Sequence, residues 1–113
     1  MIQLEDQQLA AFAPGLDAQF RGRCLEALRA LGRWPEERLA RALDIGLERA
    51  AALGLSEERS VLAYLLLAVE ITAARPAEAL LRSLEAILAD ATLTELQRVR
   101  LARDYFLQMH TAG

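Results

Sequence analysis

Glycine and proline divide this 113-residue chain into segments of helix length. The dividing positions are Pro14-Gly15, Gly32 with Trp34-Pro35, Gly54, and Arg75-Pro76. Glycine commonly follows the last turn of a helix, and proline is favoured in the first turn of the next one. The spacing therefore predicts several helices joined by short connections, which favour antiparallel neighbours.

Leucine and alanine supply most of the apolar residues between these breaks, and aromatic residues make up only 5% of the chain. Both residues lose little side-chain freedom in a helix, whereas strands favour β-branched and aromatic residues. We therefore expect an all-α fold, a compact antiparallel bundle of about five helices with a short N-terminal helical segment. The expected helices span 17–32, 35–53, 56–74, 76–89 and a last segment from 92–94 to near 110. They form one domain, 1–113, in which residues 1–13 either dock or stay loosely attached.

The most apolar stretch, residues 61–74, predicts a central helix that its neighbours surround. It is too short to span a bilayer, and it contains one charged residue, Glu70. One interpretation is that Glu70 lies near the helix end, where it reaches solvent or pairs with an arginine such as Arg75. The other is that Glu70 forms a polar anchor inside a groove that receives a partner. In the preceding helix, Gly46 lies near the apolar stripe, which predicts close approach of a neighbouring helix.

Charge and cysteine content limit the possible partners and compartments. The chain has 13 basic and 16 acidic residues, a net charge of −3, whereas nucleic-acid binders usually carry a basic excess. Cys24 is the only cysteine and lies on an apolar stripe, so we expect a buried thiol in a reducing compartment. The N-terminus is acidic where a signal peptide would be basic. We expect a cytoplasmic protein that binds neither nucleic acid nor membrane.

Residue patterns for catalysis or metal binding are missing from the sequence. His110 is the only histidine and lies three residues from the end, so we expect it at the surface. No Cys/His ligand spacing, glycine-rich phosphate loop or Ser–His–Asp arrangement occurs. The acidic pairs Glu36-Glu37 and Glu57-Glu58 fall in first turns of expected helices, where the helix dipole favours them. We expect a protein that is not an enzyme and needs no cofactor or metal.

Binding to another protein is the remaining class of function. Trp34 in a connection is either an interface anchor or a lid on the core of its own chain. Leu9 and Phe12 share one face of the N-terminal segment, which is suited to a partner's groove or to pairing two copies. The last helix concentrates basic charge, either as a solvated face or as a patch for an acidic partner. The candidate partner-binding residues are Leu9, Phe12, Trp34, Glu70, Arg98, Arg100 and Arg103.

Three stretches together suggest a family. They are residues 20–23 (FRGR) leading to 28–29, residues 45–50 (IGLERA) continuing through 53–58 (LGLSEE) to Tyr64 and Leu67, and residues 86–90 (AILAD). Over residues 17–107 the chain resembles small helical proteins encoded beside the spike, tip and effector genes of bacterial type VI secretion systems. The resemblance implies an accessory role, as an adaptor or chaperone that helps a toxin load onto the secretion spike.

The leading hypothesis is a non-enzymatic adaptor or chaperone for a type VI secretion effector, whose partner is the effector or a spike or tip component. It would capture a partner segment in an apolar helical groove, with arginine and glutamate at the rim. One alternative is an immunity protein that binds and neutralises a toxin. Another is a homodimeric helical structural protein, because the high apolar content would allow two copies to pair through an exposed apolar patch.

Overall fold

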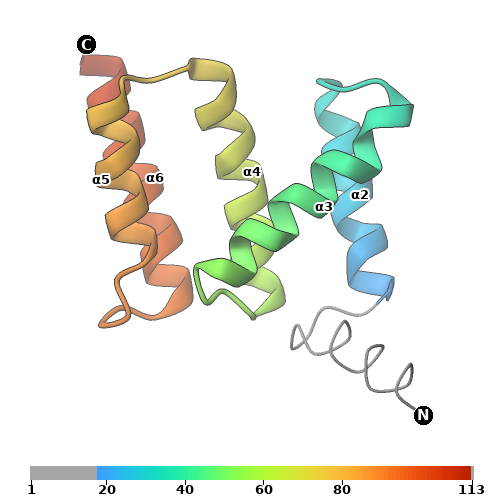
Figure 1. Cartoon of the computed structure of the whole chain (residues 1–113), viewed down its shortest axis with the longest axis horizontal. Helices are drawn as coiled ribbons and strands as arrows, with labels where there is room; N and C mark the ends of the chain where they lie inside the picture. The colour runs from blue at the N-terminus through green and yellow to red at the C-terminus, as the bar shows by residue number, and fades with distance from the viewer. Residues whose placement is uncertain (1–17, 113) are drawn as a thin grey trace.

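The computed structural model describes residues 18–112, and every regular element in that range is an α-helix (Figure 1). The helices are α2 (Ala18–Leu31), α3 (Glu36–Ala52), α4 (Glu58–Ala74), α5 (Glu78–Leu88) and α6 (Glu95–Ala112). The predicted all-α fold is confirmed, and most helix ends fall within two residues of the expected positions. None of these helices combines the length and the apolar character needed to cross a membrane.

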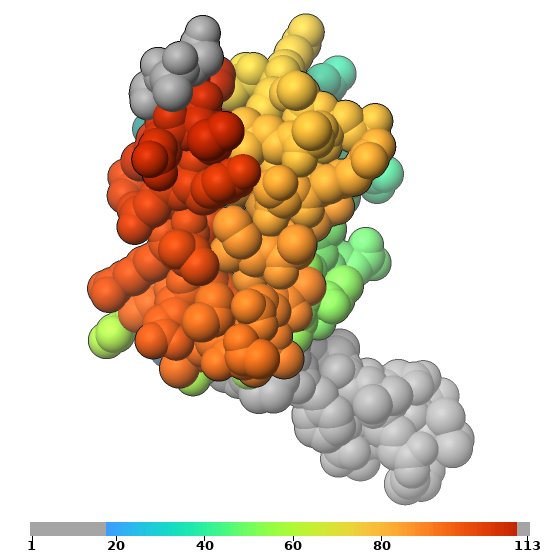
Figure 2. All heavy atoms as spheres, turned by 90° about the vertical axis from the view of Figure 1, so that its left-hand side faces the viewer, coloured from blue at the N-terminus to red at the C-terminus, as the bar shows by residue number. Residues whose placement is uncertain are grey.

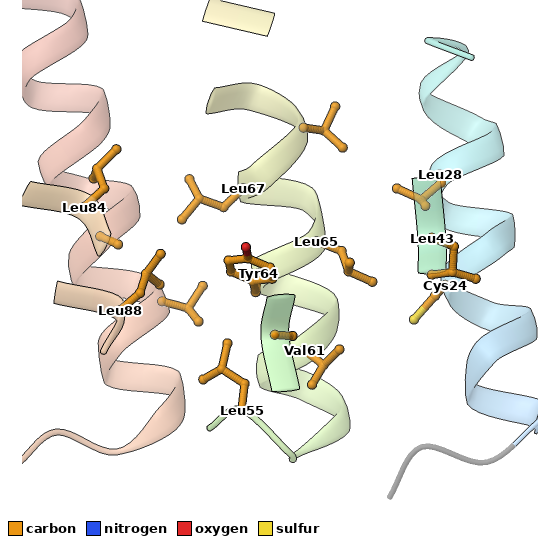
Figure 3. Packing of buried hydrophobic residues seen from close by; sticks show 14 of the residues in the cluster. Cys24, Leu28, Leu43, Leu55, Val61, Tyr64, Leu65, Leu67, Leu84 and Leu88 are labelled. Atoms are coloured by element: carbon orange, nitrogen blue, oxygen red, sulfur yellow. The ribbon is translucent and has the colours of Figure 1, made fainter. Parts of the chain in front are cut away.

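Helix α4 lies at the centre of the arrangement and contacts α2, α3 and α6. Helices α2 and α3 form a hairpin on one side of it, and α5 and α6 form a hairpin on the other (Figure 1). The second hairpin forms one end of the molecule (Figure 2). Apolar side chains from all five helices meet between these layers: Phe20, Cys24, Leu28, Leu39, Leu43, Val61, Leu65, Leu67, Leu84, Leu88, Val99 and Phe106 are buried (Figure 3).

Helices α4 and α5 differ from the other consecutive helices because they do not pack against each other. An extended link, residues 75–77, carries the chain across from the end of α4 to the start of α5 (Figure 1). Within the described chain, α5 packs only on α6, and α6 in turn packs on α4. Short connections predicted that neighbouring helices would pack antiparallel. Here α4 and α5 do run in opposite directions, but each packs on α6 and they do not contact each other.

Gly46 allows α3 and α4 to approach closely, as the sequence predicted. A methyl group added at Gly46 would overlap the side chain of Leu65 on α4. Leu65 is only 3% exposed, so it has little room to move away. Glycine at this position therefore sets the distance between the two helices.

Cys24 is buried on α2, as the sequence predicted. Burial raises the pKa of the Cys24 thiol to about 11, although the nearby arginine Arg23 lowers it slightly. The thiolate is the reactive form of cysteine, so this side chain behaves as part of the core.

The first turn of α4 is held by a residue that is distant in sequence. The N-cap of α4 is Glu57, whose side chain makes no capping hydrogen bond. Instead, the Glu95 carboxylate at the start of α6 accepts hydrogen bonds from Ser56 N (2.8 Å), Ser56 Oγ (2.9 Å) and Glu57 N (2.9 Å). At α6, Thr94 and Gln97 form a capping box, through bonds of 2.9 and 3.2 Å. The ends of α4 and α6 are thereby fastened together.

Candidate functional site

The space between α4 and α5 is an apolar groove with a volume of about 780 Å³. Leu53 from the end of α3, Tyr64 and Ile71 from α4, and Leu81, Leu84 and Leu88 from α5 line it. Figure 3 shows Tyr64, Leu84 and Leu88 facing this space from opposite sides. We call it the α4–α5 groove. It exists because α5 packs on α6 and stands away from α4.

A second, smaller hollow of about 240 Å³ lies between α3 and α4. Trp34, Ile45 and Val69 are among its lining residues, and we call it the α3–α4 hollow. Ala68 and Thr72, one turn apart on α4, line both the groove and the hollow. The two depressions therefore lie on either side of one open face of α4, which carries small side chains.

This open face corrects one sequence-based expectation. The apolar run of residues 61–74 predicted a helix surrounded by its neighbours. The structure buries Val61, Leu65, Leu67 and Val69, but it leaves Ala68 and other residues of α4 only partly covered. Part of the apolar character of α4 thus belongs to a surface depression and not to the core.

Three charged residues stand at the rim of the groove: Arg49 on α3, Arg75 at the end of α4, and Glu85 on α5. Elsewhere, opposite charges are paired across helices, for example Arg21 with Asp44 at 2.7 Å and Arg29 with Glu36 at 2.6 Å. Among the described residues, none of the three rim charges forms an ion pair. The rim therefore offers two positive groups and one negative group for contacts beyond the described residues.

Tyr64 lies between two of these charges. It is 7% exposed, and burial raises the pKa of its hydroxyl, an effect that Arg49 opposes and Glu85 adds to. The described part of the chain provides no hydrogen-bond partner for this hydroxyl, and it is not sealed from solvent. The groove therefore carries the Tyr64 hydroxyl among apolar side chains, an arrangement suited to orienting a bound molecule.

Arg75 adopts a conformation that is unfavourable for its residue type. It ends α4 in the left-handed region, with φ 49° and ψ 58°, and its backbone N–H donates to the carbonyl of Ile71. Glycine is the usual residue at such a position, because any side chain adds strain of about 1 kcal/mol or more. The exposed Arg75 side chain lies at the end of the groove.

Among the described residues, Trp34 is the one predicted binding residue that lines either depression, and it lines the α3–α4 hollow. It also packs against the core, which supports the interpretation as a lid on its own chain, whereas its role as an interface anchor stays a prediction. Glu70 is exposed on α4 and lines neither depression, so the interpretation as a groove anchor is wrong and the solvent interpretation holds. No ion pair between Glu70 and Arg75 occurs among the described residues. Leu9 and Phe12 lie outside residues 18–112.

The three arginines of α6 do not form a single basic face. The guanidinium of Arg98 is half-buried and donates to the carbonyl oxygens of Leu53 (2.9 Å), Leu93 (3.2 Å) and Leu88 (3.5 Å). It joins the ends of α3 and α5 to α6, which is a structural role that the sequence did not reveal. Arg100 and Arg103 are exposed on α6, away from both depressions.

Sequence reasoning missed the residues that define the groove, although Arg49 gave a signal. Its neighbours one turn away on α3, Ile45 and Leu53, are apolar, so no acidic residue on the same helix can pair with it. A lone arginine on an apolar stripe marks the edge of a buried surface. The position of Glu85 opposite Arg49 depends on the separation of α4 and α5, which no local pattern encodes.

The described residues show no arrangement that suggests metal binding. No three of their His, Cys, Asp and Glu side chains gather in a way that could hold a metal ion. His110 is exposed and stacks on Phe106 with 5.3 Å between ring centroids. Comparisons with protein-family models, curated proteins and solved structures return no match. The groove geometry is therefore the main structural guide to function.

Proposed function

We propose that this protein is a non-enzymatic binding module that holds an amphipathic helix of a partner protein in the α4–α5 groove. The observation that carries the proposal is an apolar groove whose rim charges form no ion pair within residues 18–112. Amphipathic helices bind other proteins by laying their apolar face into such a groove.

The dimensions of the site favour a helix as the occupant. From Tyr64 to Arg75 the groove follows α4 for about 16 Å, at a rise of roughly 1.5 Å per residue, which matches about three turns of a partner helix. Ala68 and Thr72 on the floor are small enough to let a second helix approach closely. A helix lying over them would place side chains both in the groove and in the α3–α4 hollow.

The resemblance to proteins encoded beside type VI secretion genes suggests the specific form of this function. In that form the protein is a cytoplasmic adaptor or chaperone, and the captured helix belongs to an effector or to a spike or tip component. Shielding an apolar segment of a protein awaiting secretion is a task that an open apolar groove suits.

Site-directed photo-crosslinking in the bacterium that encodes the protein tests this proposal. A photoreactive phenylalanine analogue in place of Leu81, which is 36% exposed on α5, would lie on the wall of the groove and leave the small floor residues unchanged. The same analogue in place of Leu101, which is 48% exposed on α6, is the matched control. We expect the probe at position 81 to crosslink to one defined protein, which mass spectrometry identifies, and the probe at position 101 not to.

The identity of the crosslinked protein separates the outcomes. If the crosslinked protein is a secretion effector or a spike component, the adaptor role is supported. If it is an unrelated protein, the groove is supported as a binding site but the secretion role is contradicted. The same crosslinks at both positions, or none at position 81, would show that the groove is not the binding site.

A further inference from the structure

The rim charges of the α4–α5 groove, which form no ion pair with any described residue, differ in sign between its two sides. Arg49 and Arg75 lie on the side formed by α3 and α4, and Glu85 lies on the side formed by α5. Resting on the function proposed above, we infer that the partner helix is acidic: carboxylates border its apolar stripe on the edge that faces Arg49 and Arg75.

Charge complementarity supports this choice. Arg21, Arg23 and Arg29 on α2 each lie within 2.6 to 2.7 Å of a carboxylate on another helix, so their charge is balanced within the fold. Arg49 and Arg75 have no such acid in the described chain. They give the rim a local positive excess on a chain whose net charge is −3. Complementary rim charges select the partner and fix its orientation more than they add affinity.

The backbone at Arg75 supplies a second argument. Its left-handed conformation would be better tolerated by glycine, so folding alone does not favour arginine there. Its side chain is exposed beside the groove. An arginine that is held in an unfavourable conformation at the mouth of a binding site is explained by an anionic group that it meets in the complex.

Two stapled helical peptides provide the probes for the test. Both have about 14 residues, roughly four turns, and an identical leucine–alanine face, but glutamates border the face in one and lysines in the other. Fluorescence anisotropy measures their binding to the full-length protein. We expect the glutamate peptide to bind about tenfold more tightly, because the lysine peptide meets like charge at two of the three rim positions.

Variants of the full-length protein assign the difference to individual residues. Arg49→Glu should weaken binding of the glutamate peptide about fivefold, whereas Arg100→Glu, which reverses an exposed arginine away from the groove, should leave it unchanged. Arg75→Gly should raise the midpoint of thermal unfolding and yet weaken binding of the same peptide. If Arg75→Gly gains stability without losing affinity for the peptide, Arg75 does not take part in binding.

The remaining outcomes overturn the inference in distinguishable ways. Equal affinity for both peptides, or equal effects of Arg49→Glu and Arg100→Glu, would show a helix site without charge selection and leave the proposed function intact. Tighter binding of the lysine peptide would show that the partner helix is basic and not acidic. Binding of laurate but of neither peptide would assign the groove to a small amphiphile, and a dimer abolished by Ala68→Arg would assign it to a second copy of the chain. These last two results would also contradict the proposed function.

Discussion

Gly22 and Gly46 both lie inside helices, but a side chain would have different surroundings at each. A methyl group added at Gly22 on α2 would have no atom within 4 Å, whereas one added at Gly46 on α3 would overlap Leu65. The sequence identified Gly46 because it lies near an apolar stripe. The overlapping residue could not be predicted, since it depends on how α3 and α4 align.

Replacing each glycine with alanine should therefore change stability in opposite directions. Gly22→Ala should raise the free energy of unfolding by about 0.5–1 kcal/mol, because alanine restricts the unfolded chain and favours helix. Gly46→Ala gains the same helix propensity but must displace buried Leu65, so we expect a net loss of about 1–2 kcal/mol. Urea denaturation of both variants measures the difference. A stabilised Gly46→Ala variant would show that Leu65 can move aside.

At the scale of helices, the sequence located most elements but not the contacts that fasten their ends. The capping box of Thr94 and Gln97 joins residues three positions apart, so it is a local feature at the expected start of the last helix. The cap that Glu95 provides for α4 joins residues 39 positions apart and was missed. Only the packing of α6 on α4 brings these groups together. The groove was missed for the same reason, since it lies where two consecutive helices fail to pack.

Glu95→Gln tests this long-range cap. Partial burial raises the pKa of Glu95, whereas the hydrogen bonds from Glu57 and Ser56 lower it. Together the hydrogen bonds outweigh burial, so the pKa of Glu95 lies below its ordinary value. We expect the variant to lose about 1–3 kcal/mol of unfolding free energy at neutral pH, because charge-assisted hydrogen bonds weaken. Glu48→Gln, at an exposed carboxylate of α3, is the control and should change it by less than about 0.5 kcal/mol.

The pH dependence gives an independent check of the same cap. A carboxylate with a lower pKa in the folded state stabilises the protein fully above its unfolded pKa, near 4.5, and loses this effect as the pH falls through the folded value. Stability should therefore fall less steeply below about pH 4.5 in Glu95→Gln than in the unchanged protein. Parallel curves would mean that the Glu95 cap is not formed in solution.

On the scale of the whole molecule, α4 and α5 depend on the rest of the fold to different degrees. Helix α4 contacts three other helices, whereas α5 contacts only α6 among the described elements. Leu84 and Leu88 are buried, but Leu81 is 36% exposed at the groove. One wall of the proposed binding site is therefore the helix that packs on the fewest other helices among the described elements.

Native-state hydrogen exchange should show this difference directly. We expect backbone amides of α5 to exchange faster than those of α4, because opening α5 separates it from one neighbour and opening α4 disrupts the whole core. Adding the glutamate-bordered peptide should slow exchange in α5 more than in α2, which lies away from the groove. Equal protection of α4 and α5 without peptide would indicate that the two helices open as one unit.

The burial of Cys24 has a practical consequence. It is the only cysteine of the chain, it is fully covered, and its pKa of about 11 keeps it protonated under ordinary conditions. The sequence also contains no lysine. A thiol-reactive dye would therefore modify only molecules in which α2 has separated from the core, so the labelling rate reports how often the hairpin of α2 and α3 opens. The protein carries its own internal probe of unfolding on the side of α4 opposite the α5–α6 hairpin.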